Sequence, residues 1–574
     1  MKYHEVIVVG GGLAGLRAAV EINKHNHKAA VISKVHPLRS HSLEAQGGIN
    51  ASLGNHVRGG FDDYMRHAFD TVKGSDYLAD QPAAILMTKI APKVIYEMEH
   101  WGCPFSRTED GKIAQRPFGG AGFPRTCYAT DKTGHVLLHT LYEQIKKYKD
   151  WSERQQMTEY NEWIVTRLVV QDGKCHGVIA MELATGKLEM FKADAVIFAT
   201  GGPGRIYGET TNALISTGMA MSIPYWAGVP LKDMEFVQFH PTTLYGSNIL
   251  MTEGCRGEGG YLMNSKGERF LANYPDSAKA MEIAPRDITS RNMTKEVIEG
   301  RGVQGKYLNL DLRHLGEKKI SLKLPGIRDL AINFAGVDPV KEPIPVIPAQ
   351  HYTMGGIDVD INCESKVKGF FAAGECASVS VHGANRLGGN SLLETIVFGE
   401  IAGQSAVKHI ESGSAPPDEN ALKDGLAKEE EKINNLINLN GSEKYTDIKN
   451  QLGTLMNENV GIFRNKKDLQ KAVDGIKDLQ KRYKNIGLKY KGRKLNLELM
   501  WLLELKGNLD VAETIAAGAL AREESRGSHY RMDFTVRDDK KFLKHTLAYF
   551  DEKEAKFEYS DVELGTWEPK ERKY

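Results

Sequence analysis

Residues 5–24 read EVIVVGGGLAGLRAAVEINK, and this stretch decides the fold. Its apolar start, Glu5 to Val9, is typical of a buried strand, and the residues beyond the glycines predict a helix from Leu16 to Lys24. A second apolar run, Ala29 to Ser33, follows after a short polar connection. Strand, helix and strand in this order predict a βαβ unit and therefore an α/β fold.

The glycines of this unit have the spacing Gly10-x-Gly12-x-x-Gly15. This pattern provides a tight turn, a close approach of the backbone to a pyrophosphate and close helix packing, with the helix N-terminus facing the phosphates. The acidic residue that NAD-binding folds carry at the end of the second strand is replaced by Ser33 and Lys34. The unit therefore predicts dinucleotide binding but disfavours a nicotinamide dehydrogenase.

Two later strand ends carry the same kind of signal. An apolar run from Asp194 to Thr200 ends at Gly201-Gly202, and another run from Gly369 ends at Gly374-Glu375. Several strand ends that converge on one cofactor are expected for FAD rather than for a mononucleotide. Tight turns without a ligand are the alternative for each site taken singly.

The bulk composition is that of a large globular protein. A chain of 574 residues is too long for one hydrophobic core, so several domains are expected. The 75 basic and 74 acidic side chains balance, which gives no indication of a polyanionic partner. No apolar run is long enough to span a membrane, and the first one leads into glycines rather than into a signal-peptide cleavage site.

The six cysteines are scattered along the chain and form no CxxC pair. Iron–sulfur and structural zinc sites usually need such closely spaced thiolates. We therefore expect no metal site built by this chain alone, and reduced thiols.

Periodicity changes along the chain. Residues 162–184 predict a β-hairpin that turns at Asp172-Gly173. After residue 413 the sequence is rich in lysine and glutamate with helical spacing, which is clearest over residues 421–439 and 468–483.

The fold class is therefore α/β, with a Rossmann-like domain interrupted by an insertion. Its predicted parts are a discontinuous FAD-binding domain over residues 1–244 and 349–412, an inserted α+β capping domain over 245–348, a helical domain over 413–540 and a C-terminal tail over 541–574.

One segment, RSHSLEAQGG over residues 39–48, resembles the flavin-attachment segment of the succinate dehydrogenase and fumarate reductase flavoprotein family. In that family the histidine corresponding to His41 is bonded covalently to the flavin 8α-methyl group, so the resemblance implies covalent FAD. Thr217-Gly218-Met219 departs from the family at a place where many members carry an aspartate near the flavin. Further blocks that resemble the family are residues 116–120, 240–242, 252–258, 286–287, 351–356, 385–391 and 522–533.

The resemblance also implies contacts with the cofactor. Glu375 is expected to hold hydroxyl groups of the ribityl chain or the ribose, and Ser391 and Leu392 to present backbone donors to the pyrimidine edge of the flavin. The expected cofactor-binding residues are Gly10, Gly12, Ala14, Gly15, Ser33, Lys34, His41, Ser42, Gln46, Gly47, Gly48, Gly201, Glu375, Arg386, Ser391 and Leu392.

The same blocks imply a site for a four-carbon dicarboxylate. By resemblance, His351 and Arg386 hold one carboxylate and His240 and Thr252 hold the other, since guanidinium forks and imidazoles suit carboxylates. Phe118 is expected to pack near the bound acid. Without the blocks, satisfied core histidines and a structural salt bridge would be the alternatives.

Arg286 is the expected proton carrier, although an arginine has a free pKa above about 12. By analogy with the family, Glu253 and Arg256 would form the relay between Arg286 and solvent, and His240 completes the expected catalytic set. A plain ion pair is the alternative for Glu253 and Arg256.

Electrons from the expected flavin need a route outside this chain, because we expect the chain to have no ligands for an iron–sulfur cluster and no membrane segment. The resemblance implies an iron–sulfur subunit and a membrane anchor of cytochrome b type that exchanges electrons with quinone. Since no transit peptide precedes Tyr3, we expect a peripheral position on the cytoplasmic side of a bacterial membrane.

Three rival functions fit these residues less well. L-aspartate oxidase shares the flavin fold, but His41 and the block at residues 522–533 argue against it. A flavin-binding electron-relay subunit without dicarboxylate turnover is disfavoured by the complete set of dicarboxylate residues, and an NAD-linked dehydrogenase by Ser33-Lys34. The resemblance leaves the direction open between succinate oxidation in the tricarboxylic acid cycle and fumarate reduction in anaerobic respiration, with fumarate reduction slightly favoured.

Overall fold

The computed structural model describes residues 1–150 and 156–573. The predicted βαβ unit is present as β1 (Lys2–Val9), α1 (Leu13–Lys24) and β2 (Ala29–Ser33), with β1 and β2 parallel. The predicted bounds of β2 were right, but β1 and α1 both begin earlier than predicted. The helix starts directly after Gly12, so its unpaired N–H groups lie at the glycine-rich turn.

A seven-stranded sheet in the order β6-β2-β1-β9-β8-β7, with β16 also paired to β9, forms the centre of the molecule. Five of these strands run parallel, namely β6, β2, β1, β9 and β16. Their parallel direction and their order are typical of a doubly wound dinucleotide fold. The order reverses between β1 and β9, and ligands of such sheets bind outside the carboxyl ends of the strands at this point. The bounds are β6 Met157–Asn161, β7 Trp163–Gln171, β8 Lys174–Glu182, β9 Leu188–Phe198 and β16 Phe370–Ala372.

The predicted hairpin is confirmed as β7 and β8, which pair antiparallel around Asp172 and Gly173. Both turn residues have positive φ angles of 52° and 72°, which suits aspartate and glycine. β9 begins six residues before the predicted start at Asp194, because its first half pairs with β8 of the hairpin.

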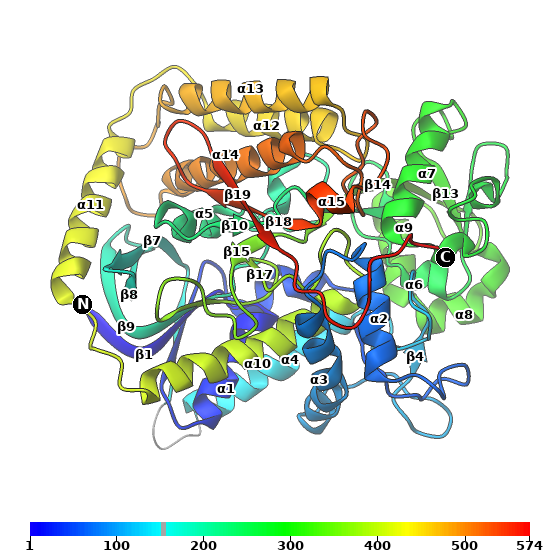
Figure 1. The fold of residues 1–574 in the computed structure, drawn as a ribbon, viewed down its shortest axis with the longest axis horizontal. Helices are drawn as coiled ribbons and strands as arrows, with labels where there is room; N and C mark the ends of the chain where they lie inside the picture. The colour runs from blue at the N-terminus through cyan, green and yellow to red at the C-terminus, as the bar shows by residue number, and fades with distance from the viewer. Residues whose placement is uncertain (151–155, 574) are drawn as a thin grey trace.

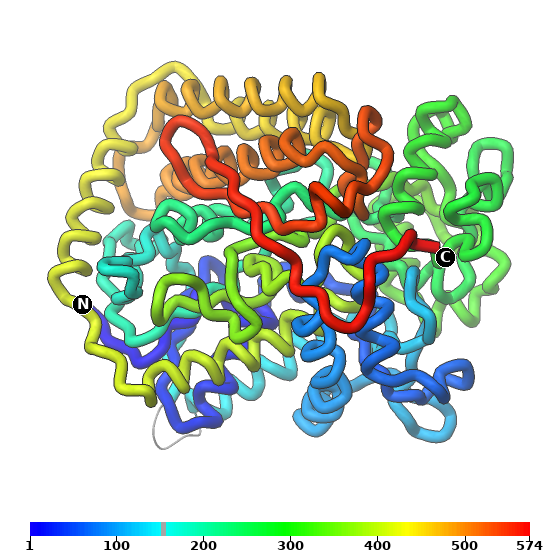
Figure 2. Tube along the Cα trace, in the orientation of Figure 1, coloured from blue at the N-terminus to red at the C-terminus, as the bar shows by residue number. Residues whose placement is uncertain are grey.

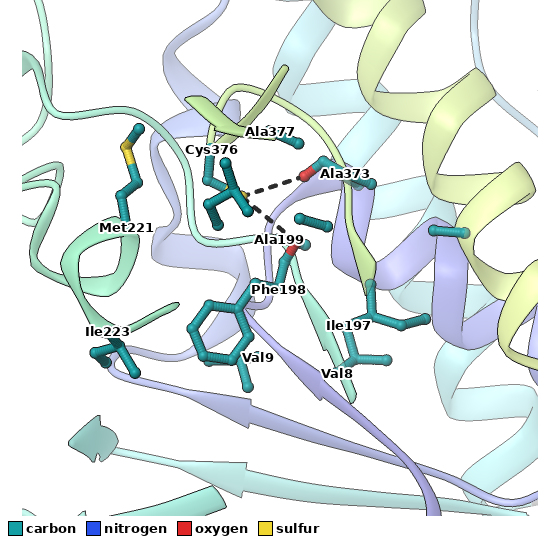
Figure 3. Packing of buried hydrophobic residues seen from close by; sticks show 14 of the residues in the cluster. Val8, Val9, Ile197, Phe198, Ala199, Met221, Ile223, Ala373, Cys376 and Ala377 are labelled. Carbon is teal, nitrogen blue, oxygen red and sulfur yellow. Dashed lines mark hydrogen bonds between the residues drawn. The ribbon is translucent and has the colours of Figure 1, made fainter. Parts of the chain in front are cut away.

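Apolar side chains at the strand ends pack tightly beside this reversal point. Val9 of β1 and Phe198 of β9 are register partners in the buried core (Figure 3). The Cys376 thiol lies 3.4 Å from the carbonyl oxygen of Phe198 and 3.5 Å from that of Ala373, and ties the segment after β16 to β9.

α10 (Asn390–Glu411) packs against α1 on one face of the sheet. Gly399 and Gly403 permit this contact, because a Cβ on them would lie only 2.6 and 2.7 Å from backbone oxygens of α1. Neighbouring elements are α2 (Tyr64–Gly74), α3 (Gln81–His100), α4 (Thr133–Asp150) and the small sheet of β3 (Ile49–Asn50), β4 (Gln115–Arg116) and β5 (Thr126–Cys127).

A second hydrophobic core lies between Leu244 and Val346, separate from the main core. We call residues 245–348 the cap; it is the green lobe in Figure 1. Its mixed helices and strands agree with the predicted α+β character, while the predicted domain limits stay predictions. Its elements are α6 (Gly254–Gly257), β12 (Tyr261–Met263), α7 (Arg286–Ile298), β13 (Leu308–Asp311), α8 (Gly316–Lys323) and α9 (Pro325–Ala335). The strands β11 (Val237–Leu244) and β14 (Ile344–Thr353) join the cap to the main unit and complete a sheet in the order β11-β14-β13-β12.

Helices dominate the chain after residue 413, as predicted. The two helices expected over 421–439 and 468–483 begin two residues earlier than predicted. The helices are α11 (Glu419–Ile437), α12 (Tyr445–Asn459), α13 (Lys466–Tyr483) and α14 (Leu497–Ala521), and α14 packs on α5 (Met219–Trp226).

The C-terminal residues contain a strand pair that the sequence did not predict. β18 and β19 extend a sheet in the order β17-β15-β10-β18-β19. The chain then crosses α2 and α3 and ends beside the cap (Figures 1 and 2). The bounds are β10 Leu231–Lys232, β15 Gly356–Asp358, β17 Ala377–Ser378, α15 Asp539–Phe542, β18 Lys544–Tyr549 and β19 Lys556–Asp561.

Candidate active site

One cavity of about 650 Å³ runs from the carboxyl ends of β1 and β9 to the inner face of the cap. All predicted site residues line it except Gly15 and Arg256, which lie behind its wall. The structure therefore brings together residues that are as much as 382 positions apart, from Gly10 to Leu392.

The glycines form a backbone cradle at one end of the cavity. Gly10 has a φ of 111°, and a Cβ there would collide with the carbonyl oxygen of Ala199. A Cβ at Gly15 would collide with the carbonyl oxygen of Gly10, so Gly15 acts through packing rather than by lining the cavity. No acidic residue stands in the first turn of α1, which leaves its positive end open to an anion.

Buried polar atoms without partners surround the cavity. They include Ser40 Oγ, Gln46 Oε1, Thr200 Oγ1 and Arg205 Nε. Buried polar groups normally have a hydrogen-bond partner, so these atoms fit a large polar ligand such as FAD. Ser42, another predicted contact, accepts a hydrogen bond from the backbone N–H of Leu13 at 3.2 Å.

Ser33 and Lys34 occupy the end of β2, as the sequence predicted. The Lys34 ammonium is paired with Glu504 of α14 and donates to the carbonyl oxygen of Ile215 at 3.0 Å. The Thr217-Gly218-Met219 segment lies beside this pair, since Asn508 of α14 donates to the Thr217 carbonyl oxygen.

His41 borders the cavity within a short 3-10 helix. Its Nδ1 accepts a hydrogen bond from the backbone N–H of Ala213 at 3.3 Å. Burial, reinforced by the positive charge of Arg205, lowers the pKa of His41 to about 4, so the imidazole is neutral at pH 7. Arg205 was missed by the sequence reasoning, because nothing in its neighbourhood signals a role.

Glu375 and α10 form the opposite wall of the cradle. Glu375 Oε1 accepts a hydrogen bond from the backbone N–H of Thr353 at 3.2 Å, and burial raises the pKa of Glu375 to about 8. Ser391 and Leu392 lie in the first turn of α10, where the N–H groups have no partner within the helix.

Two histidines and an arginine face each other at the cap end of the cavity. The rings of His240 and His351 are 5.0 Å apart, and Arg386 lies over the ring of Tyr352 at 4.3 Å. Burial, together with the charge of Arg286, lowers the pKa of both histidines well below the usual value. Both imidazoles are therefore neutral hydrogen-bonding groups at pH 7.

Phe118 and Thr252 lie beside this group and close to Gly47. A Cβ at Gly47 would lie 2.9 Å from the Phe118 ring and 3.5 Å from Thr252 Oγ1. The absence of a side chain at Gly47 therefore lets the two residues reach the cavity wall.

Arg286, Glu253 and Arg256 form a buried chain of charges. Arg286 Nε donates to Glu253 Oε2 at 2.7 Å, and the Glu253 Oε1 atom accepts from the backbone N–H of Gly119 at 2.6 Å. Arg256 Nη2 is 3.9 Å from Glu253 Oε1. Burial opposes ionisation of Glu253, but Arg286 and Arg256 outweigh it and lower the carboxyl pKa. The contact expected between residues 253 and 256 is thus present.

Gln238 joins the two cavity arginines and was missed by the sequence reasoning. Its fully buried Oε1 accepts from Arg286 Nη1 at 3.1 Å and from Arg386 Nη2 at 3.0 Å. Its Nε2 donates to Asn385 Oδ1 at 3.0 Å. Gln238 lies two residues before His240 on β11, and residues two apart on a strand share a face, so this spacing could have revealed it.

The sequence predicted neither a metal site nor a membrane-spanning segment, and both predictions can be compared with the residues that the structure describes. Within residues 1–150 and 156–573, no group of three or more histidine, cysteine or acidic side chains could hold a metal ion. Over the same ranges, no helix is both long and apolar enough to cross a bilayer. All six cysteines are buried and outside disulfides.

Comparison with known proteins identifies relatives over the whole chain. The family described as FAD binding domain matches residues 5–392, and the family described as fumarate reductase flavoprotein C-term matches residues 449–574. The chain therefore has an FAD-binding domain followed by a C-terminal domain of known type.

Individual relatives carry two different names. The fumarate reductase flavoprotein subunit of Escherichia coli K12 is 44% identical over 99% of this chain and 96% of the relative. The succinate dehydrogenase flavoprotein subunit of Rickettsia bellii is 44% identical over 98% of this chain and 96% of the relative. A solved structure of the FrdA subunit of E. coli quinol fumarate reductase, a single-site variant, has a TM-score of 0.95 and 43% identity and covers 100% of this chain and 99% of that chain.

Proposed function

Because this chain belongs to the family of fumarate reductase and succinate dehydrogenase flavoprotein subunits, we propose that it interconverts succinate and fumarate at a covalently held FAD. The observation that carries the proposal is one continuous cavity with a nucleotide cradle at one end and two arginines and two histidines at the other. FAD, when bound, supplies the centre that takes and returns a hydride.

The cap end of the cavity suits a dianion of four carbons. Arg386 and His351 would hold one carboxylate, and His240 and Thr252 the other. Neutral imidazoles can donate hydrogen bonds to carboxylates without adding charge, and an arginine fork adds charge-assisted bonds. Phe118 would exclude water from one side of the bound acid.

Arg286 would carry the proton between solvent and the substrate carbon next to the one that exchanges the hydride. Its guanidinium is held on one side by Glu253 and on the other by Gln238, at 2.7 and 3.1 Å. In fumarate reduction Arg286 donates the proton and regains one through Glu253 and Arg256. In succinate oxidation the same groups accept the proton, so the chain of charges serves both directions.

His41 would be the attachment point of the flavin. A pKa of about 4 keeps its imidazole unprotonated, which is the nucleophilic form needed to make a bond to the 8α-methyl group. Arg205 supports this state, because its positive charge disfavours a second positive charge on His41.

Electrons leave or reach the flavin through other subunits in this proposal. A related structure is a quinol fumarate reductase. We propose an iron–sulfur subunit and a membrane anchor of cytochrome b type as partners, with quinone as their reactant and the complex on the cytoplasmic side of a bacterial membrane. Fumarate reduction remains the slightly favoured direction, and the domain limits 244/245, 348/349 and 412/413 are part of the same proposal.

The purified holoprotein tests the proposal in two steps. Succinate-dependent dye reduction is measured first, and the same sample is then precipitated with acid and the pellet examined for flavin fluorescence. Activity together with flavin in the pellet supports the proposal. Flavin released by acid, with reduction by L-aspartate instead of succinate, would replace it by an aspartate oxidase function.

A further inference from the structure

Arg572, near the end of the described residues, lies against the start of α7, the helix that carries Arg286. Arg572 Nη2 is 2.6 Å from Asp287 Oδ2, and Asp287 is the residue directly after Arg286. Arg572 Nε is also 3.4 Å from Asp76 Oδ2, in the turn after α2. One side chain therefore contacts a carboxylate of the cap and a carboxylate of the main unit.

The segment before Arg572 is anchored to the main unit. The side chain of Gln81, at the start of α3, accepts from the backbone N–H groups of Thr566 and Trp567 at 2.7 and 2.8 Å and donates to the Trp567 carbonyl oxygen at 2.6 Å. The Trp567 ring also packs 5.7 Å from the ring of Phe69. Arg572 thus follows a segment that is anchored to the main unit, and in Figure 1 the red C-terminal segment ends beside the green cap.

Asp76 and Asp287 differ in how far their charge pairing depends on Arg572. Asp76 is also bound by Arg537 Nη1 at 2.8 Å and by the backbone N–H of Gly527 at 2.9 Å. Asp287 is fully buried, its other charged neighbour Arg291 is 3.4 Å away, and its Oδ1 atom has no hydrogen bond. Loss of Arg572 would therefore leave the cap carboxylate poorly paired and the main-unit carboxylate well paired.

The cap has its own hydrophobic core, and units of this kind generally shift as bodies relative to the part of the protein on which they pack. The cavity lies between the cap and the main unit, and Arg286 reaches into it from the first position of α7. A shift of α7 would carry Arg286 away from Arg386, which lies in the main unit just before α10, and from Gln238, which lies on β11 before the cap begins. Catalytic groups must be held closely in place, so such a shift would slow proton transfer.

We propose that Arg572 is a positioning residue that ties Asp287 on the cap to Asp76 on the main unit and so keeps Arg286 aimed at the dicarboxylate. The predicted effect on turnover rests on the proposed function. The contact of Arg572 with Asp287 and Asp76, which we call the clamp, can be measured without turnover. Arg572 does not contact the substrate in this proposal, and proton transfer is still assigned to Arg286.

Arg572→Gln in the purified holoprotein is the test, with Arg537→Gln as the matched control. Both arginines bind Asp76, and Arg537 Nη1 also donates to the Lys570 carbonyl oxygen at 2.9 Å, but of the two only Arg572 reaches Asp287. The contacts of Gln81 with residues 566 and 567 still hold the segment in the control. Loss of one charge-assisted contact at a buried carboxylate predicts that kcat of Arg572→Gln falls about 10- to 100-fold while KM changes about threefold or less. Arg537→Gln should keep kcat within about threefold of the wild type.

Amide hydrogen exchange in α7 tests the clamp independently of enzymatic activity. Amide exchange in α7 should become faster in Arg572→Gln but not in Arg537→Gln, and Arg572→Lys should restore part of the protection. If Arg572→Gln does not fold, Asp287→Asn provides the same readouts from the other side of the contact.

Unchanged α7 exchange and unchanged kcat in Arg572→Gln would overturn the clamp. Faster α7 exchange in a protein that turns over neither succinate nor fumarate would support the clamp as a contact and reject the proposed function instead.

Discussion

Gln238→Met removes the single oxygen that joins Arg286 and Arg386. Methionine keeps the length of the side chain but cannot accept a strong hydrogen bond, so two buried guanidinium groups lose a partner. Hydrogen bonds to charged groups contribute about 1.5–3 kcal/mol each, so two of them amount to about 3–6 kcal/mol. At about 1.4 kcal/mol for each factor of ten, kcat/KM should fall between about 10²- and 10⁴-fold.

Steady-state assays with succinate and with fumarate measure this loss. Both directions should be affected, because the two arginines serve both, while flavin content should not change. Gln115→Met is the matched control, since Gln115 is a buried glutamine that donates to the carbonyl oxygen of Ala51 at 2.7 Å, away from the two arginines. A Gln238→Met protein with kcat/KM within about fivefold of the control would refute the reasoning.

Three further predictions concern the flavin, the proton carrier and the pH dependence of stability. His41→Ser should bind FAD that acid releases, with succinate oxidation impaired more than fumarate reduction; flavin that stays in the acid pellet would contradict this attachment point. Arg286→Ala should lose turnover in both directions by at least about 10³-fold while flavin remains bound, as judged by its absorbance, and near-normal turnover would remove Arg286 from the mechanism. His545 is buried, which would lower its pKa, but Asp233 at 2.6 Å and Asp80 at 3.1 Å outweigh burial and raise the pKa to about 9. Because this folded-state pKa exceeds the unfolded value of about 6.5, the stabilisation is complete below that pH and is lost as the pH rises through about 9. Thermal unfolding between pH 6 and about 9.5 should show this decline in the wild type, and an equally steep decline in His545→Gln would count against the assignment.

Local patterns predicted the nucleotide end of the protein well. The strand, glycine turn and helix at the N-terminus depend on residues close in sequence, and so does the hairpin turn at Asp172-Gly173. The start of α1 was placed too late, because the glycines of the turn are poor helix formers and hid the true first turn. Packing of α1 against α10 and the strands of the sheet outweighs that propensity.

Long-range partnerships could not be predicted in the same way. Arg572 and Asp287 are 285 positions apart, and neither lies in a pattern that signals a contact. The pairing of β18 with β10 depends on how the helices after residue 413 bring the C-terminal residues back to the main unit. The convergence of the residues proposed to bind the dicarboxylate was expected only through the resemblance to a known family, since no periodicity links β11, β14 and the loop before α10.

Anaerobic titration of the purified holoprotein with succinate tests the central claim most directly. The proposed function predicts that succinate bleaches the oxidised flavin absorbance and that fumarate added afterwards restores it, with no other reductant present. A flavin that dithionite reduces but succinate leaves oxidised, and that fumarate does not reoxidise, would contradict the assignment of this cavity to succinate and fumarate.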